Sequence, residues 1–188
     1  MVKEDFTMRL KQFIFGTFFA VTATCAVAAN LNSVKQDYLK TGQSIVDMVN
    51  RGDVDTDSVR ASVIELTRDS VLLAQEYLVK YPEGKALITE VINEVASLDA
   101  SGNVTGLGPM AEDSFDYMEK HWHDLGFMEG KSYGIDMEDE DNEHFTDPLH
   151  VMIHPIMVFR AAQDKNLDAM KAEMQEGMEQ IEITVNAM

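Results

Sequence analysis

Residues 147–162 read DPLHVMIHPIMVFRAA, and this stretch decides the predicted fold. Asp147 followed by Pro148 is a typical helix start. An Asp side chain can accept the first unpaired backbone N–H groups, and proline fits the first helical position without losing a hydrogen bond. The residues from Leu149 to Ala162 are apolar on nearly every side of the helix that they would form. Because such a helix must be covered by others, the stretch predicts a central helix.

The segments on both sides of this central helix are also helical in pattern. Asp164-Lys165-Asn166 interrupts the pattern, and amphipathic stripes with a spacing of three to four residues lie before and after it. The apolar positions of the five stripes are Val34, Tyr38, Ile45 and Met48; Val59, Val63, Leu66, Leu73 and Tyr77; Leu87, Val91, Val95 and Leu98; Phe115, Met118, Trp122 and Leu125; and Leu167, Met170, Met174, Met178, Ile181 and Val185. We predict an all-α fold, an antiparallel helical bundle of four main helices with extra segments.

Polar and turn-forming residues mark the ends of the first two stripes. Ser33 with Gln36 resembles a capping box that begins a helix. Arg51-Gly52 supplies a basic last turn and a glycine that ends the same helix. Residues 53–57 offer Asp and Thr side chains that can cap the second helix, and Tyr81-Pro82 stops it.

The connections between the later stripes are polar. Residues 99–109 are rich in turn formers and have no apolar period, so they predict a loop, and no strand is expected. A fourth helix is expected from about Glu112 to Leu125, ending at Gly126. An acidic linker over residues 129–146 then leads to the central helix.

The N-terminus has the layout of a secretory signal peptide. Arg9 and Lys11 precede an apolar run over residues 13–21, and small residues follow at Ala26-Val27-Ala28. This order of charge, apolar core and small residues suits the export machinery. We expect a signal peptide over residues 1–28, cleaved after Ala28 or Ala29. Residues 29–188 would then form one exported domain, periplasmic or secreted.

Two alternatives concern this same segment. An uncleaved membrane anchor is disfavoured because the apolar stretch is shorter than the roughly 20 residues that span a bilayer. Met8 is a more ordinary start than Met1, since acidic residues between them fit a signal peptide poorly. Cys25 is the only cysteine, and Thr24 before it argues against lipidation. The cleaved chain would have no thiol and no membrane span.

The charge of the chain is strongly negative. Lys and Arg total 15 against 33 Asp and Glu, which gives a formal net charge of −18 at pH 7. Nucleic acids and anionic lipids need clustered positive charge, so both are excluded as partners. A metal cation or a basic protein partner remains compatible with this surface. The oligomeric state does not follow from the sequence.

The densest acidic run, residues 136–143, contains six carboxylates in eight residues. Hard cations prefer such oxygen ligands, but an EF-hand loop also needs a glycine at its sixth position and a glutamate at its twelfth. Neither register of the run supplies both. The run is therefore interpreted as a solvated linker, with loose cation binding or docking on a basic partner as the alternative.

Two of the five histidines lie on the central helix. His150 and His154 are four residues apart, so their rings should share one face, with Met157 close to the same line. Two imidazoles on one face can bind a transition metal ion. The alternative is that both are core or interface histidines held by hydrogen bonds, because two ligands do not complete a tetrahedral site. His154 precedes Pro155, which removes a backbone donor and leaves the carbonyl of residue 151 in need of a partner.

The other three histidines are weaker candidates. His121 borders the apolar side of the fourth predicted helix and is the third candidate ligand, whereas His123 falls on the polar side. His144 lies in the acidic linker and could join from a loop. The candidate metal site therefore consists of His150, His154, His121 and Met157.

Motif searches favour a binding protein over an enzyme. No G-x-S-x-G, H-E-x-x-H, P-loop or dinucleotide fingerprint is present. Covalent haem is excluded because C-x-x-C-H is absent. Met170, Met174 and Met178 recur at helical spacing and are interpreted as core filler.

We expect a non-catalytic interaction or structural module. The first alternative is a bundle that binds a transition metal or non-covalent haem through residues 121–154, and the second is a metal-dependent enzyme.

Overall fold

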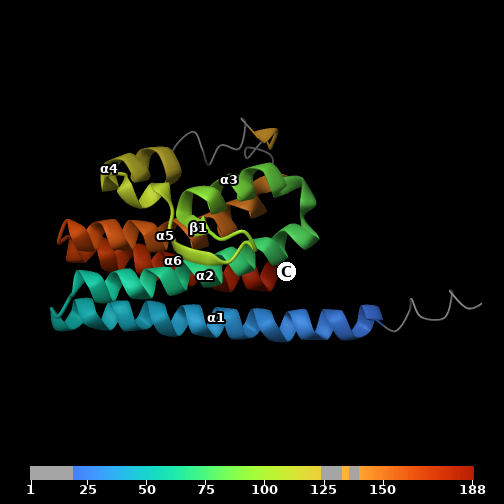
Figure 1. The fold of residues 1–188 in the computed structure, drawn as a ribbon, viewed down its shortest axis with the longest axis horizontal. Coiled ribbons are helices and arrows are strands. Elements are labelled where there is room, and N and C mark those ends of the chain that lie inside the picture. Colours follow the sequence, from blue (N-terminus) through green and yellow to red (C-terminus); the bar gives the residue numbers. More distant parts are fainter. Residues whose placement is uncertain (1–18, 124–132, 136–139) are drawn as a thin grey trace, which may run out of the picture.

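The computed structural model describes residues 19–123, 133–135 and 140–188 (Figure 1). Within these ranges the chain is mostly helical, as predicted. The α-helices are α1 (Phe19–Arg51), α2 (Thr56–Lys80), α3 (Lys85–Val95), α4 (Phe115–Met118), α5 (Thr146–Gln163) and α6 (Leu167–Ala187). The strands are β1 (Ala96–Leu98) and β2 (Val104–Leu107), and the short helical turns are η1 (Pro82–Gly84), η2 (Pro109–Glu112), η3 (Glu119–His123) and η5 (Glu140–Phe145).

Helix α5 occupies the centre of the molecule, as its apolar sequence predicts. It packs most extensively against α6 and α2 and also contacts α3. The long helix α1 packs on both α2 and α6 (Figure 1). Between Pro148 and Phe159, every residue of α5 is buried except His150, which is half-buried. No helix among the described residues is long and apolar enough to cross a membrane.

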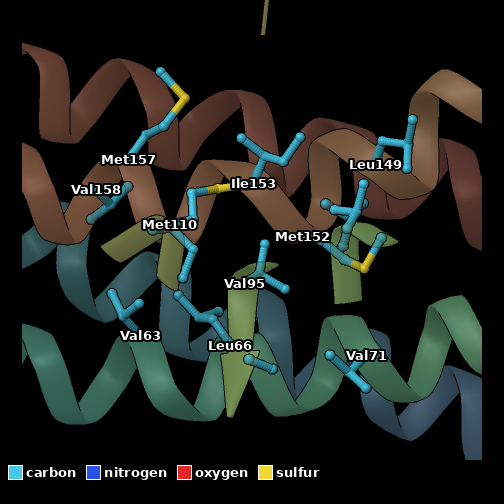
Figure 2. Packing of buried hydrophobic residues seen from close by; sticks show 14 of the residues in the cluster. Val63, Leu66, Val71, Val95, Met110, Leu149, Met152, Ile153, Met157 and Val158 are labelled. Atoms are coloured by element: carbon cyan, nitrogen blue, oxygen red, sulfur yellow. The ribbon is translucent and has the colours of Figure 1, made fainter. Parts of the chain in front are cut away.

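The main hydrophobic core lies between α5 and α2. Figure 2 shows Val63, Leu66 and Val71 on α2 facing the side chains of α5, with Val95 and Met110 filling the space between the helices. All five side chains are nearly or completely excluded from solvent. Figure 1 places α3 and the hairpin beside this core.

Several helix ends are formed by the residues that the sequence marks. Helix α1 ends at Arg51, and Gly52 adopts a positive φ of 66°. Asp55 caps α2, because its carboxylate accepts a hydrogen bond from the Ser58 N–H at 2.9 Å. Lys165 turns the chain at φ 58°, and Asn166 caps α6. These signals act within a few residues, which explains why they can be read locally.

The expectation of a strandless loop after the third helix is wrong. Helix α3 ends at Val95, and residues 96–98 form an antiparallel pair with residues 104–107. The turn is closed by the Asp99 carboxylate, which accepts hydrogen bonds from the backbone N–H groups of Ser101 and Asn103 at 2.8 and 3.0 Å. The same turn formers that predict a loop can close a hairpin, and only the partner strand distinguishes the two.

The predicted start of the first helix is also wrong. Helix α1 begins at Phe19 and passes through Ser33, whose hydroxyl donates to the Asp37 carboxylate at 3.5 Å. Residues 19–33 contain neither proline nor glycine, so nothing local forces a new helix start. Residues 1–18 lie outside the described residues.

The fourth and fifth predicted helices are shifted. Helix α4 is short, is capped by the Ser114 hydroxyl and continues into the π-helical turn η3. Leu125 and Gly126 lie outside the described residues, as does the first half of the acidic run, residues 136–139. Its last residues form η5, which leads directly into α5 at Thr146. Asp147 is therefore in the first turn rather than at the cap, where its charge still complements the helix dipole.

Candidate functional site

His150 and His154 lie side by side on α5, as their spacing predicts. Their ring centroids are 5.2 Å apart and the ring planes are inclined by 33°. His154 is only 1% exposed, whereas His150 is half-buried. The pair lies on the central helix, which packs closely against α6. Any chemistry of these rings therefore depends on what α6 presents to them.

Helix α6 presents two carboxylates to His154. The Nδ1 atom of His154 is 2.8 Å from Oε2 of Glu173, in a buried hydrogen bond. Its other ring nitrogen, Nε2, is 3.8 Å from Oε2 of Glu176. Glu173 and Glu176 are three residues apart, so both project from one face of α6. The Glu173 side chain is 12% exposed and that of Glu176 is 55% exposed.

The carbonyl that Pro155 deprives of its helical donor has a partner. Tyr38 of α1 is completely buried, and its hydroxyl donates to the Val151 carbonyl at 3.1 Å. Burial, and secondarily the charge of Asp69, raises the pKa of Tyr38, so the hydroxyl keeps its proton and its role as donor. The helix assignment continues unbroken through Pro155. Sequence analysis predicted the need for a partner but could not identify one 113 residues away.

Gly177 brings α6 close to this hydrogen bond. A Cβ atom at this position would lie 2.8 Å from the Tyr38 hydroxyl and 3.2 Å from Cβ of His154. A side chain there would force α1 and α5 away from α6. The absence of a side chain at Gly177 thus permits the close approach of the three helices beside His154.

The other two residues of the predicted metal set lie in different surroundings. His121 is exposed, with its ring 4.1 Å from that of Tyr117. Met157 is completely buried in the hydrophobic core. Among the residues that the structure describes, no group of three or more His, Cys, Asp or Glu side chains is placed to hold a metal ion. The side chain of His123 lies outside the described part of the chain.

His144 belongs to an aromatic cluster formed by Tyr77, Tyr81, His144 and Phe145. The Tyr77 hydroxyl donates to the His144 carbonyl at 2.8 Å, and the Tyr81 ring centroid is 4.4 Å from that of His144. Burial raises the pKa of Tyr77, with smaller contributions from Tyr81 and Asp147. The cluster joins the end of α2 to the start of α5. The sequence did not predict this cluster, because His144 was placed in the acidic linker, where a loop position gives no geometric constraint.

A polar groove lies between α1 and α2. Its volume is about 460 Å³, and it is lined by Asp37, Lys40, Thr41, Ser44, Ser62, Glu65, Arg68 and Asp69. Burial, with repulsion from Asp37, raises the pKa of Asp69 to about 6. The groove escaped sequence analysis because these residues form the polar faces of two helices, and only the packing of α1 on α2 brings them together.

Comparison of the chain with protein-family models, curated proteins and solved structures found no match.

Proposed function

We propose that this chain is a non-catalytic interaction module that binds a cationic partner in the groove between α1 and α2. The observation that supports it is the groove itself, in which packing of α1 on α2 brings Asp37, Glu65 and Asp69 together, and in which burial and the charge of Asp37 raise the pKa of Asp69 to about 6. Burial is the largest cause of this raised pKa and repulsion from Asp37 is the next, so both disfavour the ionised form of Asp69. A lysine or arginine side chain of a partner would relieve this repulsion.

The remaining groove residues give such a partner an orientation. Lys40 and Arg68 lie beside the carboxylates, so the groove carries both signs of charge. Arg68 lowers the pKa of Asp69 but does not offset burial and the charge of Asp37. A basic side chain between Asp37 and Asp69 would pair with both, while Lys40 and Arg68 would repel a misplaced cation. The partner favoured by this arrangement is a peptide segment with isolated basic residues.

We further propose that the module is exported as an antiparallel helical bundle after cleavage of residues 1–28. The support is the basic, apolar and small-residue order of the N-terminus. N-terminal sequencing of the protein recovered from the periplasm or the medium tests this proposal. The expected first residue is Ala29 or Asn30. Recovery of a membrane-bound chain that begins at Met1 or Met8 would contradict it.

Fluorescence anisotropy with a labelled ten-residue peptide, in which two separated lysines stand among neutral residues, tests the groove. We expect binding in low salt, weakened at least tenfold in the double variant Asp37→Asn and Asp69→Asn. The control is the double variant Glu179→Gln and Glu182→Gln, which removes two exposed carboxylates of α6. If this control weakens binding as much as the groove variant, net charge alone attracts the peptide and the groove has no specific role.

A further inference from the structure

The contact between α5 and α6 places the His154 imidazole opposite two carboxylates, and the His150 ring lies beside it. His150 and His154 come from one helix, and Glu173 and Glu176 from the other. Metal sites of helical bundles are built from side chains of this kind on facing helices. The groove between α1 and α2 involves none of these four residues.

The buried contact between His154 and Glu173 determines which ring nitrogen faces outward. A carboxylate accepts hydrogen bonds, so Glu173 at 2.8 Å favours the tautomer with the proton on Nδ1. This leaves the lone pair of His154 on Nε2. A histidine that binds a metal usually donates its other N–H to a carboxylate in this way. His154 is thus oriented as a ligand, with Glu173 as its positioning residue.

The distances around Nε2 suit one bound ion. Zinc bonds to nitrogen and oxygen are about 2.0 to 2.2 Å, so two tetrahedral ligand atoms lie about 3.4 Å apart. Nε2 of His154 and Oε2 of Glu176 are 3.8 Å apart. The Glu176 side chain is 55% exposed and has room to adjust by a few tenths of an ångström.

The ring separation of the histidine pair leads to the same conclusion. Two imidazoles on one tetrahedral ion have ring centroids about 5.2 Å apart, since each centroid lies about 3.2 Å from the metal. The centroids of His150 and His154 are 5.2 Å apart. The described side chains do not yet form a three-ligand group. Rotation of the His150 ring and adjustment of Glu176 are the changes needed.

We propose that the α5–α6 contact binds one divalent transition-metal ion of the zinc class. His150, His154 and Glu176 are its ligands, and Glu173 positions His154. Imidazole with a single carboxylate favours such ions over Ca²⁺ and Mg²⁺, which prefer oxygen ligands. His121 and Met157 have no part in the site, which replaces the ligand set expected from the sequence.

Cobalt titration of the chelator-treated protein, purified without a histidine tag, tests the proposal. One equivalent of Co²⁺ should produce the visible absorption of tetrahedral cobalt, and Zn²⁺ should remove it. We expect His150→Gln and Glu176→Gln to weaken Co²⁺ binding at least tenfold. Glu173→Gln should weaken it about 10- to 100-fold while keeping one equivalent, because the ligands remain but His154 loses its orientation.

The control variant is Glu179→Gln, which removes an exposed carboxylate from the same helix. Its affinity should equal that of the wild type. His150 is half-buried and Glu176 is exposed, so their variants should fold. They therefore test metal binding even if a substitution at buried His154 prevents folding. The proposal is overturned if the wild type binds no Co²⁺ or Zn²⁺, or if the His150 and Glu176 variants bind as tightly as the control.

Discussion

Tyr38 shows how one distant side chain makes a helix-breaking residue tolerable. Proline within a helix leaves a carbonyl without its donor, and a buried polar group without a partner costs about 1 to 3 kcal/mol. The Tyr38 hydroxyl supplies the missing hydrogen bond to Val151 at 3.1 Å. Pro155 can therefore remain in the most buried helix of the molecule.

Removal of this hydroxyl should be costly only while the proline is present. We expect Tyr38→Phe to lower the free energy of unfolding by about 1 to 3 kcal/mol. In a Pro155→Ala background the amide of residue 155 can donate to Val151, so the same substitution should cost at least about 1 kcal/mol less. Urea unfolding of the four proteins measures both effects. Equal costs in the two backgrounds would show that the hydrogen bond does not replace the helical donor.

Asp69 makes the folded state sensitive to pH in the opposite sense to a salt-bridged carboxylate. Its pKa rises from 3.8 to about 6 on folding, so the folded state holds the proton more tightly. Its contribution therefore falls as the pH rises from about 4 to about 6. Asp69→Asn should stabilise the protein at pH 7 by about 1 kcal/mol, a value reduced for solvent screening because the residue is only half-buried.

The same Asp69 substitution should have almost no effect at pH 3, where the carboxyl is largely protonated in both the folded and the unfolded state. Unfolding midpoints at the two pH values give the comparison. Glu182→Gln, at an exposed position of α6, is the matched control and should change little at either pH. An Asp69→Asn variant that is less stable than the wild type at pH 7 would disprove the assignment of repulsion and burial as the dominant effects.

The residue-level contacts of the candidate site were only partly predictable. The four-residue spacing predicted that His150 and His154 share a face, because helix geometry is local. The partners of His154, Glu173 and Glu176, lie on another helix, and nothing in the sequence distinguishes them from the many other acidic residues of the chain. The rotation of α6 against α5 decides which carboxylates meet the rings, and this rotation depends on the packing of both helices together.

At the scale of elements, the hairpin depends on a close approach at Gly108. Its N–H donates to the Val95 carbonyl at 2.9 Å. A Cβ atom here would lie 2.4 Å from the Glu94 carbonyl oxygen and 2.6 Å from the Ala96 nitrogen. Both are backbone atoms, so no side-chain rotation relieves the clash. The end of α3 and the exit of β2 therefore need glycine at this position.

We expect Gly108→Ala to destabilise the protein by on the order of 2 kcal/mol or more. Gly106→Ala is the matched control, because a Cβ atom at Gly106 has nothing within 4 Å. It should change the free energy of unfolding by less than about 0.5 kcal/mol. Thermal unfolding of the two variants provides the measurement. Similar losses for both would indicate a general cost of alanine in β2 rather than a clash with α3.

The hairpin also shows which elements a sequence can define. Helix ends at Gly52, Asp55 and Asn166 were predictable, since each cap is formed by residues within a few positions. The two strands were not, because residues 96–98 continue an apolar helical stripe and residues 104–107 are too short to show alternation. Strand pairing overrides the helical pattern after Val95, and such pairing is non-local.

At the scale of the whole molecule, the composition predicted the negative net charge, but it could not predict the groove between α1 and α2. Asp37 and Asp69 belong to separate helices, and each lies on a face that alone would be solvated. Packing of α1 on α2 brings the two faces together and raises the pKa of Asp69. The fold therefore brings negative charges of different helices close together. Their repulsion should lower the free energy of unfolding of the entire chain.

Salt should therefore stabilise this protein at neutral pH. The formal net charge is −18 at pH 7, and folding brings the like charges closer together. Raising sodium chloride from about 0.01 to 0.15 M shortens the screening length from about 30 to 8 Å. We expect a gain on the order of 1 kcal/mol in the free energy of unfolding at pH 7. Near pH 4.4, the isoelectric point of the sequence, the gain should disappear.

Urea unfolding with a chelator present excludes effects of bound metal, and chloride avoids the general stabilisation that sulfate produces. A loss of stability with salt at pH 7 would mean that attractive ion pairs outweigh the net repulsion, and the proposed cationic partner would then lose its electrostatic basis.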